Sequence, residues 1–372
     1  HTEKDAALLQ AVADGIAALN RRHSGNADGK FLLLHRRRIW NDVQRQWMGW
    51  ERKRGKLHEL NQLLRHASDT SFIDVGGVVT PVPHDVRYII TLDSDTRLPR
   101  EAIRRLIGKM SHPLNHPAFD AGLGRVTAGY GILQPRVTPS LPMGQEGSLF
   151  QRLISGPGGI DPYAAATSDL YQDLFGEGSF TGKGIYDLDA VNASLADRIP
   201  ENTVLSHDLF EGVFARAGLA SDIEVVEEFP ARYDVAAARL HRWVRGDWQL
   251  LPWLLRHIRH GAGNRREALP AMGFWKMADN LRRSLTAPAI LAALFVGWTL
   301  PLPAAAIWSL FLLTAIAVPS LAPWFASIIP HRFNVTPLSH LRALGSDLRL
   351  IILQIIGQII FLPHQAWLMG DA

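Results

Sequence analysis

The segment Tyr88-Ile89-Ile90-Thr91-Leu92-Asp93-Ser94-Asp95 indicates the fold class. Its aromatic, β-branched and apolar residues predict a buried strand over 86–92, and two carboxylates follow the strand directly. A helix is expected from about Pro99 to Met110 and a further strand from Tyr130 to Val137, so strands and helices alternate as in α/β folds. In such folds ligands bind at the carboxyl ends of strands, which is where the two carboxylates lie.

Asp93 and Asp95 are therefore predicted to hold a divalent cation. Carboxylate oxygens suit Mg²⁺ or Mn²⁺, and Mg²⁺ usually keeps other positions for water and for phosphate oxygens of a substrate. Such a cation would neutralise a leaving diphosphate. The Asp-x-Asp pattern by itself also fits a turn or a strand-end cap, because aspartate is common in turns.

Two basic, glycine-containing segments are candidates for binding phosphate. The first runs from Trp47 to Asn61 and leads into a helix expected over Lys56–His66; a helix start binds phosphate well, and Lys56 and Asn61 are its candidates. A solvated basic face or a loop attracted to anionic lipid is the alternative. The second is Gly182-Lys183-Gly184, whose spacing does not match a P-loop and so excludes an ATPase of that class.

Two later segments carry further candidates. Asp208 stands at the start of an apolar helix and could be its N-cap or a general base. The segment from Arg239 to Gln249 combines cations with tryptophans, which can bind a diphosphate and stack on a sugar face. Its candidates are Arg239, Arg242 and Trp243, with Trp248 beside the acceptor. Tryptophan and arginine are equally abundant in membrane-interface helices.

The stretch from Thr286 to Pro330 contains no Asp, Glu, Lys, Arg or His. It is too long for one membrane span of roughly 20 residues, and it predicts two spans, near Ser284–Leu300 and Ala304–Ala326. The apolar run Leu348–Met369 contains glutamines, a proline and a histidine; we expect a third span, with an interfacial helix as the alternative. A pair of very apolar soluble helices is the competing interpretation.

Basic residues flank the apolar stretch on both sides, Arg282 and Arg283 before it and Arg332 after it. By the positive-inside rule, this distribution places the hydrophilic part of the chain in the cytoplasm.

The composition excludes several classes of protein. The chain has 372 residues, enough for one large or two medium domains, and it has no cysteine, which removes disulfides, thiolate metal sites and a cysteine nucleophile. Its 39 Lys+Arg against 35 Asp+Glu give a net charge of +4, yet the interleaved aromatics of nucleic-acid-binding modules are missing, so no nucleic-acid partner is expected. The chain opens with His1 and shows no signal peptide, so we expect a piece of a longer protein.

The candidates occur in a particular order along the chain. Lys56 and Asn61 come first, and then Asp93 with Asp95, Asp208, and Arg242 with Trp243, followed by the apolar spans. This order resembles that of the processive family-two-like glycosyltransferases. The resemblance implies that the Asp-x-Asp element holds metal and diphosphate, that Asp208 is the base, and that Arg239-x-x-Arg242-Trp243 shapes the acceptor end beside a channel. Lys56, Lys183, Arg239 and Arg242 are then candidate phosphate contacts.

More specifically, four strings resemble those of cyclic β-1,2-glucan synthases. They begin at Trp50 (WERKRGKL), Tyr130 (YGILQPRV), Asp169 (DLYQDLFGEG) and His241 (HRWVRGDW). The resemblance implies a cytoplasmic GT-A-like domain over 1–260, with a Rossmann-like mixed sheet and flanking helices, then an interface helix and two to three transmembrane helices over 261–372. It also implies UDP-glucose as donor, a growing β-1,2-glucan as acceptor, inversion at the anomeric carbon, Mg²⁺ or Mn²⁺ as cofactor, the bacterial inner membrane as location, and further domains of a larger parent chain.

The resemblance further implies a first strand, with an aspartate that contacts uridine, before the helix expected over Ala6–Leu19. That strand is not seen in the sequence. A short buried strand is expected later, at Phe31–Leu34. Two alternatives to β-1,2-glucan synthesis therefore stay open. One is a related membrane synthase of another β-glucan, because linkage depends on how the acceptor is oriented. The other is a non-catalytic, glycosyltransferase-like membrane scaffold.

Overall fold

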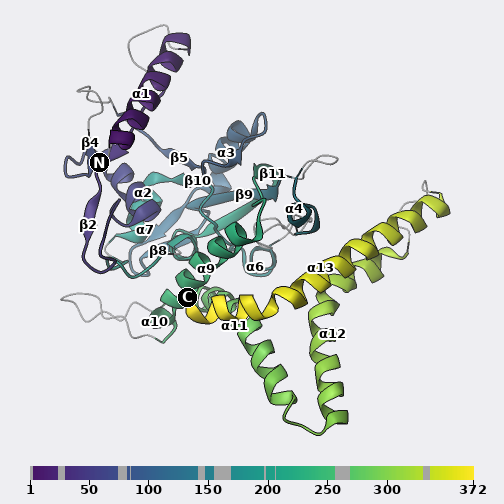
Figure 1. Cartoon of the computed structure of the whole chain (residues 1–372). Coiled ribbons are helices and arrows are strands. Elements are labelled where there is room, and N and C mark those ends of the chain that lie inside the picture. The colour runs from purple at the N-terminus through teal and green to yellow at the C-terminus, as the bar shows by residue number, and fades with distance from the viewer. Residues whose placement is uncertain are drawn as a thin grey trace.

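The computed structural model shows a mixed α/β part followed by three long helices (Figure 1). The residues that it describes are 3–23, 30–73, 82–83, 85–140, 147–154, 169–196, 198–205, 207–255, 269–329 and 336–372. The expected domain boundary at residue 260 and the flanking Arg332 lie outside these ranges.

A five-stranded sheet forms the centre of the α/β part, with strand order β5-β10-β9-β11-β6. Its strands are β5 (Tyr88–Thr91), β6 (Thr96–Arg97), β9 (Ile132–Pro139), β10 (Gly184–Asp187) and β11 (Ala217–Glu227). β9 and β11 are parallel, whereas the other neighbouring pairs are antiparallel. The prediction of a mixed sheet in an α/β fold is therefore confirmed, and β5 delivers Asp93 and Asp95 just beyond its end.

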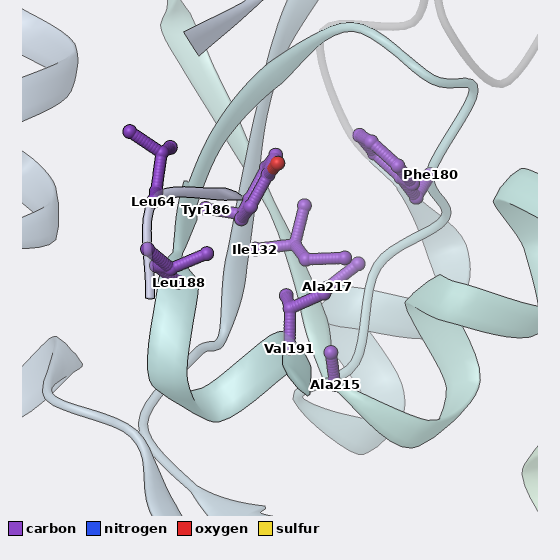
Figure 2. Packing of buried hydrophobic residues seen from close by; sticks show 8 residues of the cluster. All are labelled: Leu64, Ile132, Phe180, Tyr186, Leu188, Val191, Ala215 and Ala217. Carbon is purple, nitrogen blue, oxygen red and sulfur yellow. The ribbon is translucent and has the colours of Figure 1, made fainter. Parts of the chain in front are cut away.

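Both faces of the sheet are buried. Successive side chains of a strand point to opposite faces, and buried residues lie on each of them. Ile132 and Tyr186 pack on one face, in the cluster that Figure 2 shows, whereas their chain neighbours Leu133 and Ile185 pack on the other, in the cluster that also contains Leu106. The helices that cover the two faces therefore fix the sheet, and with it the positions of the strand ends.

The remaining elements of the α/β part surround this sheet. The helices are α1 (Glu3–His23), α2 (Arg52–Leu63), α3 (Ala102–Met110), η1 (Pro113–Asn115), α4 (Leu149–Ile154), α6 (Leu170–Phe175), α7 (Leu188–Leu195), α8 (His207–Phe214), α9 (Tyr233–Gln249) and α10 (Leu251–Leu254). Three small sheets pair β1 (His35–Arg36) with β4 (Phe72–Ile73), β2 (Ile39–Asn41) with β3 (Gln46–Met48), and β7 (Ala118–Asp120) with β8 (Arg125–Ala128).

Two expectations about the N-terminal part are wrong. Phe31–Leu34 is not a strand: the side chain of Asn20 bonds both the N–H and the carbonyl of Phe31, and the strand begins only at His35. The helix expected over Lys56–His66 begins at Arg52. The basic segment therefore forms the first turns of α2 and does not precede it, so Lys53 and Lys56 lie on one face of the helix.

Helices α11 (Ala271–Gly297) and α12 (Leu302–Ser327) form a hairpin that points away from the sheet (Figure 1). α13 (Pro337–Asp371) crosses this hairpin on the side nearer the sheet, and it packs against α11, α12, α9 and α4. Among the described residues two helices, α12 and α13, are long and apolar enough to cross a membrane. The first expected span, in α11, is not one of them, and the position of α13 across the hairpin favours the interfacial alternative for Leu348–Met369.

Candidate functional site

A cleft of about 1860 Å³ lies between α2, the ends of β5 and β11, and helices α8, α9 and α13. Its lining includes eight of the ten predicted site residues: Lys56, Asp93, Asp95, Lys183, Asp208, Arg239, Arg242 and Trp243. Asn61 does not belong to the lining. Its buried side chain accepts a hydrogen bond from the hydroxyl of Tyr186 at 2.7 Å and so fastens α2 to β10.

Three carboxylates gather at one end of the cleft. Asp93 and Asp95 follow β5, and Glu227 is the last residue of β11; each offers an oxygen within 4.8 Å of the others. Glu227 was not among the sequence candidates, because only the pairing of β11 with β6 sets it opposite Thr96, the residue that follows Asp95. Oxygen ligands in this arrangement fit Mg²⁺ or Mn²⁺.

Two lysines pair with these carboxylates. Lys53 Nζ donates to Asp93 Oδ1 at 2.7 Å, while Lys183 Nζ lies 3.0 Å from Asp93 Oδ2 and 3.1 Å from Glu227 Oε2. Glu227 also pairs with Arg239, whose guanidinium lies 4.8 Å from the ring centre of Trp243. Charges of alternating sign therefore run from α2 to α9 along the floor of the cleft.

These pairs decide the protonation of the cluster. Burial alone would raise the pKa of Asp93, but the hydrogen bonds and charges of Lys53 and Lys183 outweigh it and hold the pKa below its ordinary value. Burial would likewise lower the pKa of Lys183, but Glu227 and Asp93 raise it. The carboxylate of Asp93 is therefore ionised at neutral pH, as a metal ligand has to be.

Asp208 faces the same end of the cleft from α8. The helix begins at His207, so Asp208 lies within its first turn and is not the N-cap. Its carboxylate lies against the backbone of Gly182, where a Cβ would come within 2.7 Å of Oδ1. The carbonyl of Gly182 in turn accepts a hydrogen bond from Lys53 at 3.0 Å. Lys53 therefore links the two carboxylates: it donates to Asp93 and to the carbonyl of Gly182, and Asp208 lies against Gly182.

A buried histidine accompanies Asp208. The ring Nδ1 of His207 lies 2.8 Å from Glu211 Oε1 and 3.3 Å from Asp208 Oδ1. Burial would lower the pKa of His207, but the charges of Asp208 and Glu211 raise it to about 9. Sequence reasoning missed this cluster, although the i, i+4 spacing of His207 and Glu211 on an expected helix was a usable signal.

The far wall of the cleft is built by α9 and α13. Trp243 is 37 % exposed there, whereas the indole N–H of Trp248 donates to the carbonyl of Met369 at 2.9 Å. Trp248 therefore fastens α9 to α13. The sequence suggested a place beside the acceptor, but Trp248 does not line the cleft. Tyr233 stacks on Phe361 with ring centres 3.9 Å apart, which joins the same two helices.

Comparison with known proteins gives a match along almost the whole chain. It is 48 % identical over 369 residues to the cyclic β-(1,2)-glucan synthase NdvB of Rhizobium meliloti (strain 1021). The aligned region is 99 % of this chain and 13 % of that protein, so the chain spans about an eighth of the length of the relative it matches. No family model matches the chain. The resemblance inferred from its motifs is therefore confirmed: this chain is similar, nearly from end to end, to one part of a cyclic β-(1,2)-glucan synthase.

Proposed function

We propose that this chain is the glycosyltransferase part of a larger bacterial cyclic β-1,2-glucan synthase. It would transfer glucose from UDP-glucose to a growing β-1,2-glucan, with inversion at the anomeric carbon. The observation that carries the proposal is the meeting of Asp93, Asp95 and Asp208 in one cleft, in a chain that is 48 % identical to part of such a synthase.

The donor would bind at the carboxylate end of the cleft. Asp93 and Asp95, with Glu227 beside them, would hold Mg²⁺ or Mn²⁺, which neutralises a leaving diphosphate when bound. Lys53 and Lys183 pair with these carboxylates and would contact phosphate oxygens of the donor. Lys56, on the same face of α2 as Lys53, lines the cleft as a further phosphate contact.

Asp208 would be the general base. In an inverting transfer the acceptor hydroxyl attacks the anomeric carbon from the face opposite the leaving group, a single displacement shared with inverting glycosidases. The oxygen–carbon bond to the acceptor forms, the carbon–oxygen bond to the diphosphate breaks, and the acceptor proton passes to Asp208. The diphosphate leaves as an anion, so cations are needed on the donor side and no second acid is needed.

The acceptor would lie between Asp208 and the wall formed by α9 and α13. Trp243 offers a partly exposed aromatic face for a sugar ring, and Arg242 lines the same wall. With the hairpin of α11 and α12 crossing the bacterial inner membrane and α13 along its surface, the sheet part would lie in the cytoplasm. Other domains of the parent chain would complete the cyclic product.

Binding of UDP measured by calorimetry in the presence of Mn²⁺ tests the division of labour. We expect Asp208→Asn to bind UDP as the wild type does, whereas Asp93→Asn with Asp95→Asn loses binding. Asp189→Asn, the same change on a side chain 74 % exposed outside the cleft, is the control. Loss of binding in Asp208→Asn would make Asp208 structural, and a wild type that binds neither UDP nor Mn²⁺ would favour a scaffold. Linkage analysis of the product separates β-1,2-glucan from other β-glucans.

A further inference from the structure

We propose that His207 is a positioning residue for the base: its buried imidazolium, held from behind by Glu211, is the counter-ion of the Asp208 carboxylate and keeps it directed into the cleft. This inference rests on the proposed function, in which Asp208 is the base.

The geometry gives each of the three side chains a different place. His207 is 4 % exposed and Glu211 is 8 % exposed, whereas Asp208 opens onto the cleft with a side chain 29 % exposed. Glu211 is not among the described residues that line the cleft. His207 also lines the cleft, but it is almost fully buried there, so Asp208 is the carboxylate of this group that can reach an acceptor hydroxyl. Glu211 acts on the other two from inside the protein.

The hydrogen bond and the charge of the imidazolium act on different carboxylates. Nδ1 makes its hydrogen bond with Glu211 at 2.8 Å, and this bond fixes the orientation of the ring. Asp208 Oδ1, at 3.3 Å from Nδ1, is buried and accepts no hydrogen bond from any described residue. Its attraction to the imidazolium is thus mainly the attraction of opposite charges, which leaves Asp208 able to take up a proton from the cleft.

Without the imidazolium two carboxylates would remain close together on one helix. Like charges in a partly buried place favour uptake of a proton by one of them, and a protonated Asp208 could not serve as base. Among the described residues, the other titratable groups that act on the cluster include Lys53 of α2, whose charge acts on His207, and Tyr186 of β10, whose pKa is raised by its burial and by Glu211. Because the pKa of His207 is raised to about 9, the imidazolium is present at neutral pH.

During transfer His207 gives up no proton. The acceptor proton moves to Asp208 as the new glycosidic bond forms, and the imidazolium stays between the two carboxylates. The arrangement follows the orienting logic of catalytic triads, in which a third group holds the base.

The test is the pH profile of kcat for glucose transfer by membranes that contain the complete parent protein. Substitution His207→Gln should lower kcat at pH 7 by about ten- to a hundredfold and move the acid limb to higher pH by about one unit or more. Glu211→Gln should move the acid limb in the opposite direction, because it removes a like charge and leaves the imidazolium. The double variant should regain part of the activity lost in His207→Gln, since no second carboxylate then competes for the proton.

UDP binding keeps the outcomes interpretable, because a folded variant should bind UDP with an affinity within about threefold of the wild type. A fall in kcat with the acid limbs of both variants unchanged would overturn the inference and leave His207 a structural residue. If His207→Gln does not fold, an unshifted acid limb in Glu211→Gln is by itself enough to overturn the inference. Failure of the proposed function looks different: the wild type would make no glucan, or Asp208→Asn would make it normally.

Discussion

Substitution Gly182→Ala should displace the carboxylate of Asp208 and so lower transfer activity, although Asp208 itself is unchanged. A Cβ built on Gly182 comes within 2.7 Å of Asp208 Oδ1 and 2.9 Å of both Cγ and Oδ2, whereas ordinary contacts begin at 3.4 Å. The carboxylate would therefore have to retreat by about 0.7 Å, and a misplacement of this order costs up to about a hundredfold in rate. The positive φ of 84° at Gly182 adds strain of about 1 kcal/mol for an alanine.

Gly176→Ala separates the two effects. Gly176 also has a positive φ, 70°, but an added Cβ there meets only the guanidinium of Arg216, at 3.2 Å, which does not line the cleft. We expect both variants to lose about 1 kcal/mol of unfolding free energy and only Gly182→Ala to lose transfer activity, measured as glucose incorporated per amount of folded protein. Equal activity losses in the two variants, or full activity of Gly182→Ala, would refute the placement of Asp208 against this loop.

Three further predictions concern charge, pH and the membrane. Lys183→Met should lower the unfolding free energy by about 2 kcal/mol, because Glu227 loses a buried partner. Added Mn²⁺ should restore part of the lost melting temperature, and an unchanged melting temperature with Mn²⁺ would contradict a cation site there. His207 has a folded-state pKa of about 9 against an ordinary 6.5, so its contribution to stability should be full below pH 6.5 and disappear as the pH rises through 9. When wild type and His207→Gln are denatured at pH 6 and at pH 9.5, only the wild type should lose this part of its unfolding free energy at the higher pH. Fluorophores on Ile307→Cys in α12 and Ile360→Cys in α13, both exposed sites, should be quenched by deep and by shallow lipid quenchers respectively; a deep label at 360 would restore a third span.

Much of the donor side could be predicted from the sequence, because local patterns determine it. The strand that ends at Thr91 is marked by its composition, so Asp93 and Asp95 were placed correctly at a strand end. Asp208 was likewise expected at the start of an apolar helix, which α8 confirms. These signals are short in sequence and need no knowledge of which strands are neighbours.

The rest of the site depends on topology and on weak local signals. Glu227 joins the carboxylates because β11 pairs with β6, the short strand that begins directly after Asp95, and no local pattern encodes that pairing. Lys53 was missed because α2 begins four residues earlier than expected, after Glu51 at φ 48° and without a side-chain cap to mark the start. The placement of α13 across the hairpin depends on tertiary contacts such as that of Trp248 with Met369, which composition alone cannot indicate.

The most direct test is incorporation of labelled glucose from UDP-glucose by membranes that contain the complete parent protein, with Asp208→Asn and Asp189→Asn measured alongside. We expect β-1,2-linked polymer from the wild type and from Asp189→Asn, and none from Asp208→Asn. Polymer from Asp208→Asn at the wild-type rate, or no polymer from the wild type, would contradict a glycosyltransferase that uses this base.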